Sequence, residues 1–256
     1  MQIYAECQRK GYILRGMIHK PENISGKAPI VIMFHGFTGN RMEGGIFTGI
    51  SKELEQSGIA SARFDFVGSG ESDGNFEDMC LQSEIADGET ILDFVKELDF
   101  VDPNRIGLIG YSLGGLIASL LAPKRQADIK AMCLCSPGFS LYDDIVDNKS
   151  LTDISLENIE KDGYVDIRGN KVGREFTEDI KNLHISETIS AYKNDVLITH
   201  GKDDVIVPYH YSIKYAKKYE KVQLHLIENA SHGYETIGQR AELREEIKKF
   251  FEKKLK

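Results

Sequence analysis

Apolar runs of strand length alternate with segments of helical periodicity along most of the chain. Residues 30–34 are apolar throughout, which is typical of strands buried on both faces of a parallel sheet under two layers of helices. The alternation therefore predicts a doubly wound α/β fold with a mostly parallel sheet. The predicted strands are 28–34, 59–66, 105–110, 129–136, 196–200 and 222–227, and the predicted helices are 46–54, 83–98, 113–121, 210–219 and 241–255.

Two parts of the chain depart from this alternation. Residues 2–8 and 12–19 alternate apolar and polar side chains, which predicts an N-terminal antiparallel hairpin ahead of the parallel strands. About 60 residues then separate two of the later strands, far more than a short loop and one helix need. We expect one α/β domain, residues 1–256, with a small lid insertion at residues 139–190.

The predicted insertion contains a hairpin of its own and much of the charge. Residues 164–167 and the stretch from Val172 onward form its strands, with a turn centred on Gly169 and Asn170. Residues 139–190 hold 12 acidic and 6 basic side chains, whereas the whole chain has a net charge of −8. The insertion therefore has a net charge of −6 and accounts for most of the net charge of the chain.

Composition excludes several classes of function. No basic run is interleaved with aromatic residues, so we expect no nucleic-acid partner. The longest apolar run, residues 28–34, is too short to cross a membrane, and no secretory signal is recognisable at the N-terminus. We therefore expect no membrane association and a cytoplasmic location. Cys133 and Cys135 would face one side of a strand as buried free thiols, and we expect no metal and no cofactor.

The pattern Gly-x-Ser-x-Gly occurs twice, around Ser112 and around Ser72. Ser112 lies between a predicted strand and a predicted helix, which is the setting of a nucleophile elbow, whereas Ser72 lies in a polar loop. In such a turn the flanking Gly110 and Gly114 avoid collisions, and the start of the helix directs N–H groups toward the serine. We predict that Ser112 is the nucleophile.

A nucleophilic serine needs a base, and the base needs an acid to orient it. His232 follows the last predicted strand, and Asp203 and Asp204 follow the strand before it. Both loops lie at the carboxyl edge of the sheet, and the order serine, acid, histidine is that of α/β-hydrolases. These positions predict His232 as the base and leave the acid open between the two aspartates.

An ester or amide substrate would also need N–H donors for its oxyanion. We expect the backbone N–H of Leu113, which follows the nucleophile, and that of Phe37, in the glycine-rich loop after the first parallel strand.

Together the motifs resemble the serine α/β-hydrolase superfamily over nearly the whole chain outside the insertion. The segments that carry the resemblance are His35-Gly36-Phe37-Thr38-Gly39-Asn40, Gly110-Tyr111-Ser112-Leu113-Gly114-Gly115, His200-Gly201-x-x-Asp204-x-x-Val207-Pro208 and Ala230-Ser231-His232. In that family's pattern the acid is the fifth residue of the third segment, so the resemblance implies Asp204. It also implies a serine carboxylic ester hydrolase that acts through an acyl-enzyme intermediate on a small-molecule ester.

The loop at residues 35–40 and the inserted hairpin further resemble the bacterial cinnamoyl (feruloyl) esterases. In those enzymes the insertion roofs the site and holds a phenolic acyl group. The candidates for contact with that group are Tyr142, Asp143, Asp144 and Tyr164. Generic carboxylesterases and monoacylglycerol lipases share the core motifs and remain alternatives, as does a non-catalytic binding protein of this fold. The oligomeric state, including a homodimer, is left open.

Overall fold

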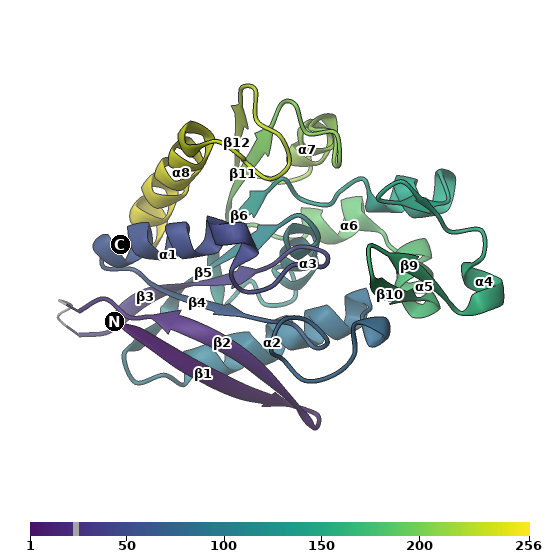
Figure 1. Cartoon of the computed structure of the whole chain (residues 1–256). Coiled ribbons are helices and arrows are strands. Elements are labelled where there is room, and N and C mark those ends of the chain that lie inside the picture. The colour runs from purple at the N-terminus through teal and green to yellow at the C-terminus, as the bar shows by residue number, and fades with distance from the viewer. Residues whose placement is uncertain (23–25) are drawn as a thin grey trace.

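The core of the computed structural model, which describes residues 1–22 and 26–256, is a sheet of eight strands (Figure 1). The strand order is β1-β2-β4-β3-β5-β6-β11-β12, and the pairings of β1 with β2 and of β2 with β4 are antiparallel, whereas the others are parallel. The strands are β1 (Gln2–Arg9), β2 (Tyr12–His19), β3 (Ala28–Phe34), β4 (Ala60–Phe64), β5 (Val101–Tyr111), β6 (Ile129–Cys135), β11 (Asp195–Gly201) and β12 (Val222–Ile227).

Helices cover both faces of the sheet, so that alternate residues of one strand belong to different cores. Val31 and Met33 of β3 pack in one buried cluster with α1 and α8, and Ile30 and Ile32 pack in another with α2 and α3. This arrangement confirms the doubly wound fold and the N-terminal antiparallel hairpin. The main helices are α1 (Ile46–Gln56), α2 (Leu81–Lys96), α3 (Leu113–Leu121), α7 (His210–Ala216) and α8 (Ile237–Leu255).

Two element boundaries differ clearly from the sequence prediction. Helix α8 begins four residues early, at Ile237, because Thr236 and Gln239 form a capping box at its N-terminus. Strand β5 begins at Val101, before the apolar run at 105–110, because Val101 pairs with Ala28 of β3. In the described part of the chain, no helix is both long and apolar enough to span a membrane.

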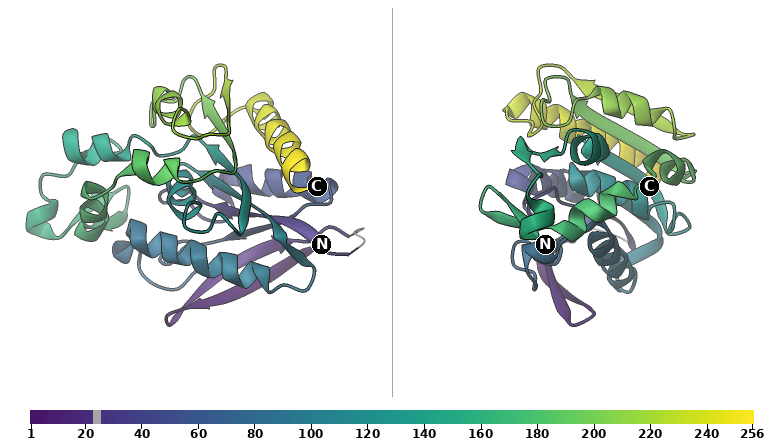
Figure 2. Two further views of the ribbon diagram at one scale, coloured as in Figure 1. Left: turned by 180° about the vertical axis from the view of Figure 1, so that it is seen from behind. Right: turned by 90° about the vertical axis from the view of Figure 1, so that its right-hand side faces the viewer.

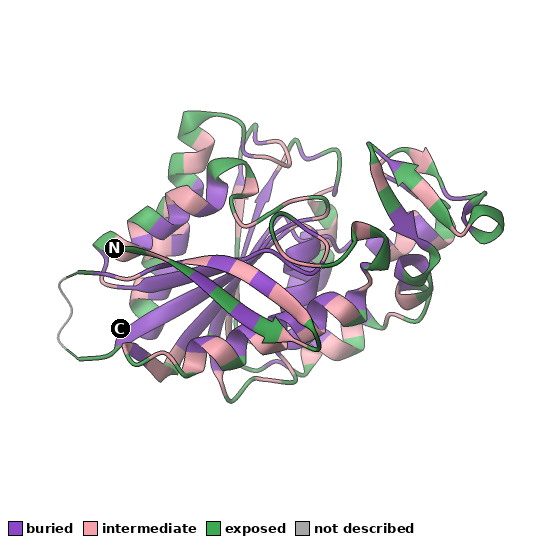
Figure 3. Ribbon diagram, turned by 60° about the horizontal axis from the view of Figure 1, so that its bottom comes forward, coloured by how far each residue is buried: buried purple, intermediate pink, exposed green. Residues whose placement is uncertain are grey.

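The connection from β6 to β11 projects beyond the carboxyl end of the sheet, as Figure 1 and the left view of Figure 2 show. Its strands β9 and β10 mix exposed and buried residues, whereas β3 in the sheet is buried throughout (Figure 3). It consists of a π-helical turn η3 (Asp143–Asp147), strands β7 (Ser150–Leu151), β8 (Ile154–Ser155), β9 (Tyr164–Ile167) and β10 (Asn170–Gly173), and helices α4 (Ile159–Asp162), α5 (Arg174–Lys181) and α6 (Ile185–Ser190).

The hairpin of β9 and β10 turns one residue earlier than expected. Asn170 pairs with Ile167, so the two turn residues are Arg168 and Gly169 rather than Gly169 and Asn170. Both turn residues have positive φ, 55° and 86°, as a type I′ turn requires. Strand β10 packs against the short 3₁₀ helix η2 (Phe76–Asp78), which lies in the loop between β4 and α2. This contact holds the projecting segment against the rest of the fold.

Candidate active site

Ser112 occupies a sharp turn between β5 and α3. Its φ of 53° and ψ of −120° lie in a region that residues with a side chain rarely adopt. A Cβ on Gly110 would lie 2.2 Å from the oxygen of Gly114, and a Cβ on Gly114 would lie 2.1 Å from the oxygen of Phe34. Glycine is therefore required at both positions for the turn to close against β3.

Three side chains from three loops form a continuous chain of hydrogen bonds. The distance from Ser112 Oγ to His232 Nε2 is 2.9 Å, and that from His232 Nδ1 to Asp204 Oδ2 is 2.7 Å. Since β5, β6, β11 and β12 are neighbours in the sheet, the loops that follow β5, β11 and β12 meet at one edge. A carboxylate only accepts, so Nδ1 carries the proton of a neutral His232 and Nε2 can accept from the serine hydroxyl.

The two adjacent aspartates lie in opposite environments. The side chain of Asp204 is fully buried, whereas Asp203 is exposed. Burial would raise the pKa of Asp204, but hydrogen bonds from His200, His232 and the Val207 N–H hold that pKa well below its ordinary value. Asp204 is therefore the carboxylate that orients His232, and it stays ionised.

His200 holds Asp204 from the side away from His232. Its Nε2 lies 3.0 Å from Asp204 Oδ2 and 2.8 Å from the carbonyl oxygen of Val207. Both neighbours are acceptors, so Nε2 carries a proton, and Nδ1 lies 2.7 Å from Ser212 Oγ. This buried histidine supports the loop and does not reach Ser112.

A cavity of about 210 Å³ opens beside Ser112. The backbone N–H groups of Phe37 and Leu113 border it, and neither donates a hydrogen bond to another group among the described residues. Two free N–H donors beside a serine hydroxyl form an arrangement that could bind an oxyanion. The other lining residues are Gly138, Ser140, Leu141, Asp144, Ser150, Leu151, Thr152, Asp153, Phe176, Val205, Ile206, Val207 and Pro208.

The structure brings one of the four candidates for acyl-group contact to this cavity. Asp144 lines it and accepts a hydrogen bond of 2.7 Å from Ser140. Tyr142 and Asp143 line a neighbouring cavity, where Asp143 accepts a hydrogen bond from Tyr211 of α7. Tyr164 is partly exposed on β9, where the ammonium of Lys171 lies over its ring. These three side chains have structural or surface contacts and do not line the cavity beside Ser112.

In the second Gly-x-Ser-x-Gly segment, the serine hydroxyl forms hydrogen bonds with the backbone. The Ser72 hydroxyl donates to the carbonyl oxygen of Asp65 and accepts from the N–H of Arg15 on β2. The first bond closes the loop after β4 on itself, and the second joins this loop to β2. Among the described residues, no histidine forms a hydrogen bond with the hydroxyl.

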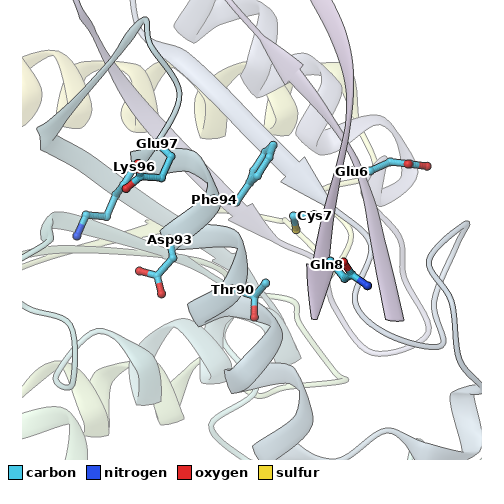
Figure 4. A pocket seen from close by; sticks show the side chains of 8 residues that line it. All are labelled: Glu6, Cys7, Gln8, Thr90, Asp93, Phe94, Lys96 and Glu97. Atoms are coloured by element: carbon cyan, nitrogen blue, oxygen red, sulfur yellow. The ribbon is translucent and has the colours of Figure 1, made fainter. Parts of the chain in front are cut away.

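A larger cavity, of about 570 Å³, is lined by residues of β1 and α2 (Figure 4). Burial raises the pKa of its Cys7 thiol to about 12, so the thiol is not an activated nucleophile. Two of its charged side chains, Asp93 and Lys96, are paired with Arg125 and Asp128. This cavity therefore contains no reactive group comparable to Ser112.

Several site residues have no signal in the sequence. Phe176 of α5 lines the cavity and stacks on Phe37 at 5.8 Å, although the two are far apart in the chain. Val205 and Ile206 are exposed apolar residues at its rim, and only their place beside Asp204 could have suggested this. Tyr111 donates its hydroxyl to the carbonyl oxygen of His232, which fixes the histidine loop.

The sequence profile of the prolyl oligopeptidase family matches residues 48–256. A structure of Est1E from Butyrivibrio proteoclasticus with bound ferulic acid is 29% identical in sequence, covers 98% of both chains and superposes with a TM-score of 0.89. The mouse α/β hydrolase domain-containing protein 10 shares the fold, with a TM-score of 0.79 at 21% identity. The α/β-hydrolase fold predicted from the sequence is thus confirmed.

Curated relatives match a shorter part of the chain, or a longer part at lower sequence identity. The quorum-quenching protein AidA of Acinetobacter baumannii is 29% identical over 44% of this chain and 37% of its own length. The first curated relatives are thus matched over only about a third of their length. The bovine mitochondrial palmitoyl-protein thioesterase ABHD10 is 23% identical over 82% of this chain and 69% of its own length.

Proposed function

Because the chain belongs to the prolyl oligopeptidase family and has the α/β-hydrolase fold, we propose that it is a serine carboxylic ester hydrolase. The observation that carries this proposal is the hydrogen-bonded chain from Ser112 through His232 to Asp204 at the wall of a cavity. Relatives that include an esterase-like structure with ferulic acid and a thioesterase support the same class of reaction.

The reaction would proceed through an acyl-enzyme. Nε2 of His232 takes the proton from Ser112 Oγ as the oxygen attacks the ester carbonyl, and Asp204 stabilises the imidazolium that forms. The N–H groups of Phe37 and Leu113 donate to the oxyanion of the tetrahedral intermediate. His232 then protonates the leaving alcohol, and a water molecule deprotonated by His232 releases the acid and restores Ser112.

For the acyl group we propose a hydroxycinnamate, with residues 139–190 as the lid that covers it. The cavity of about 210 Å³ is smaller than the roughly 300–1,000 Å³ of pockets for drug-sized ligands, so it suits one substituted ring rather than a long chain. Phe37, Phe176 and Leu141 supply apolar walls, and Asp144 supplies a carboxylate that can accept from a phenolic hydroxyl. The bound ferulic acid of Est1E supports the same choice.

The alternatives are a generic carboxylesterase and a monoacylglycerol lipase. The exposed apolar side chains of Val205 and Ile206 at the rim of the cavity favour an apolar substrate and would serve either alternative. A long acyl chain, however, needs more enclosed volume than the cavity offers.

A substrate panel with a matched pair of variants tests the proposal. We expect ethyl ferulate to be hydrolysed faster than p-nitrophenyl butyrate or a monoacylglycerol, and the anilide of ferulic acid to be hydrolysed more slowly than its ester. Asp144→Asn should lower kcat/KM for ethyl ferulate by about tenfold, because an imperfectly paired phenol loses about 1–3 kcal/mol. Ethyl cinnamate, which lacks the phenol, should change by less than about twofold.

Asp147→Asn is the matched control, because Asp147 belongs to the same helical turn but is exposed. It should leave both esters unaffected. Equal losses for ferulate and cinnamate in Asp144→Asn would make the generic carboxylesterase the better assignment, and the absence of any Ser112-dependent turnover would favour a binding protein.

A further inference from the structure

Glu43 places a carboxylate beneath the loop that carries one of the oxyanion donors. It follows β3 at η1 (Glu43–Gly45), and its Oε2 accepts a hydrogen bond of 2.7 Å from the N–H of Gly36. A Cβ on Gly39 would lie 2.7 Å from the same oxygen, so the loop leaves room for this carboxylate only because residue 39 is glycine. The mechanism described above makes no use of Glu43.

The next peptide, between Gly36 and Phe37, is held through its carbonyl oxygen. The oxygen of Gly36 accepts from the N–H of Gly39 at 2.9 Å and lies 2.9 Å from His35 Nδ1. His35 Nε2 accepts the N–H of Phe66, so Nδ1 carries the proton and donates to Gly36. In a trans peptide the N–H points opposite to the carbonyl, so these contacts aim the Phe37 N–H away from His35.

Gly36 itself lies directly against the nucleophile. A Cβ at this position would be 3.1 Å from Ser112 Cβ and 3.1 Å from Tyr111 Cδ1. A small rotation about the backbone of Gly36 would therefore change the distance between the Phe37 N–H and the substrate oxyanion beside Ser112. Glu43 restrains the preceding peptide, between His35 and Gly36, through the N–H of Gly36, and so limits rotation about the backbone of Gly36.

The carboxylate of Glu43 is also part of the electrostatic surroundings of His232. Burial raises the pKa of Glu43 to about 7, while the Gly36 N–H and the charge of His232 oppose that rise. The charge of Glu43 also helps to raise the pKa of the Tyr111 phenol on β5, after burial, its main cause. Arg240 of α8 donates to the carbonyl oxygen of Gly44, the residue after Glu43. Glu43 therefore changes its charge in the pH range in which a histidine base operates.

We propose that Glu43 is a positioning residue for hydrolysis, which holds the Phe37 N–H in the oxyanion site and supplies a second negative charge to the His232 imidazolium. The inference rests on the proposed function. Asp204 orients His232 through a hydrogen bond, whereas Glu43 acts on it through space. The two roles of Glu43 are separable, because a glutamine keeps an oxygen acceptor for Gly36 but carries no charge.

The test compares Glu43→Gln and Glu43→Leu with the wild type, by measuring kcat and KM for one ester from about pH 5 to pH 9. Glu43→Leu should lower kcat by about 10²-fold with KM changed by less than about threefold, as expected when an oxyanion donor is displaced. Glu43→Gln should retain kcat within about tenfold.

The charge is tested by the pH profile. Loss of a nearby negative charge lowers the pKa of a histidine, so the acid limb of kcat/KM in Glu43→Gln should move to lower pH by about 0.5 unit or more. Glu53→Gln on α1 serves as the control, because Glu53 lies at the surface with ion-pair distances of 3.9 Å, and it should match the wild type.

Three outcomes decide the proposal. An unshifted acid limb in Glu43→Gln overturns the electrostatic role, and a wild-type kcat in Glu43→Leu overturns the positioning role. If Glu43→Leu does not fold, Glu43→Ala replaces it as the test of the positioning role, and the pH profile of Glu43→Gln still decides the electrostatic role. Wild-type turnover that persists in Ser112→Ala would instead contradict the proposed function itself.

Discussion

At the scale of single residues, the site depends on differences between close neighbours in the chain. Asp203 and Asp204 are adjacent, yet only Asp204 is buried and contacts His232. Its Oδ1 accepts the N–H groups of Ile206 and Val207, which hold the carboxylate in place. The residues after the aspartate therefore select which of the two carboxylates faces the histidine.

This difference gives a direct prediction. Asp204→Asn should lower kcat by about 10⁴-fold, as in other triads, because an amide cannot stabilise the imidazolium or fix its tautomer. Asp203→Asn should change kcat by less than about threefold, since the side chain is exposed. Steady-state kinetics on both variants, with melting curves to show that each is folded, makes the comparison, and similar losses would contradict the assignment.

The placement of Ser112, His232, Phe37 and Leu113 at one edge of the sheet could be predicted, because each follows a strand in a short motif. The position of Glu43 could not, because it depends on a loop conformation with positive φ at residue 43 that no local pattern specifies. For contact with the acyl group, the sequence indicates only which residue types the insertion contains. Of the four candidates, only Asp144 reaches the cavity, since the direction of each side chain depends on how the inserted elements pack.

At the scale of elements, helix α2 carries two acidic side chains on its buried face. Glu84 and Asp87 are both buried, and Asp87 Oδ1 lies 2.9 Å from the Nε of Arg9 on β1. Burial, aided by the charge of Asp87, raises the pKa of Glu84 well above its ordinary value. Glu84 Oε2 has no hydrogen-bond partner within residues 1–22 and 26–256.

A raised folded-state pKa makes stability dependent on pH. The contribution of Glu84 is fully present below its unfolded pKa, near 4.3, and is lost as the pH rises through its folded pKa, because folding then requires a proton or a buried charge. Glu84→Gln should therefore gain in free energy of unfolding relative to the wild type between about pH 4.5 and about pH 8. Urea unfolding at both pH values measures this difference, and a difference independent of pH would contradict the linkage.

Element boundaries illustrate what periodicity can and cannot provide. The apolar runs predicted six strands, and each corresponds to a strand of the sheet. Most of these strands are largely buried, whereas β12 has one buried residue, Ile227, and lies at the edge of the sheet. The capped first turn of α8 and the amino-terminal part of β5 contain polar residues whose structure depends on a cap and on pairing with β3. The turn of the β9–β10 hairpin differed by one residue because Arg168 adopts a positive φ that its residue type does not signal.

At the scale of the whole molecule, the sheet brings four loops to one edge and the segment between β6 and β11 to the same edge. The loops after β3, β5, β11 and β12 contribute Phe37, Ser112, Asp204 and His232, while Asp144 and Phe176 come from the projecting segment. The order of the strands alone predicts that the four loop residues lie at one edge of the sheet. The second group depends on tertiary packing, such as the contacts of α5 with α2 and of β10 with η2.

The central claim is that Ser112, and no other serine, is activated by His232 and Asp204. Stoichiometric labelling with a fluorophosphonate tests it most directly, because the reagent requires an activated serine. In the wild type and in Ser72→Ala, we predict about one label per chain, on Ser112, and a loss of ester hydrolysis in proportion to the labelling. In Ser112→Ala we predict no label. Labelling of Ser72, or of Ser112→Ala at an equal rate, would contradict the account.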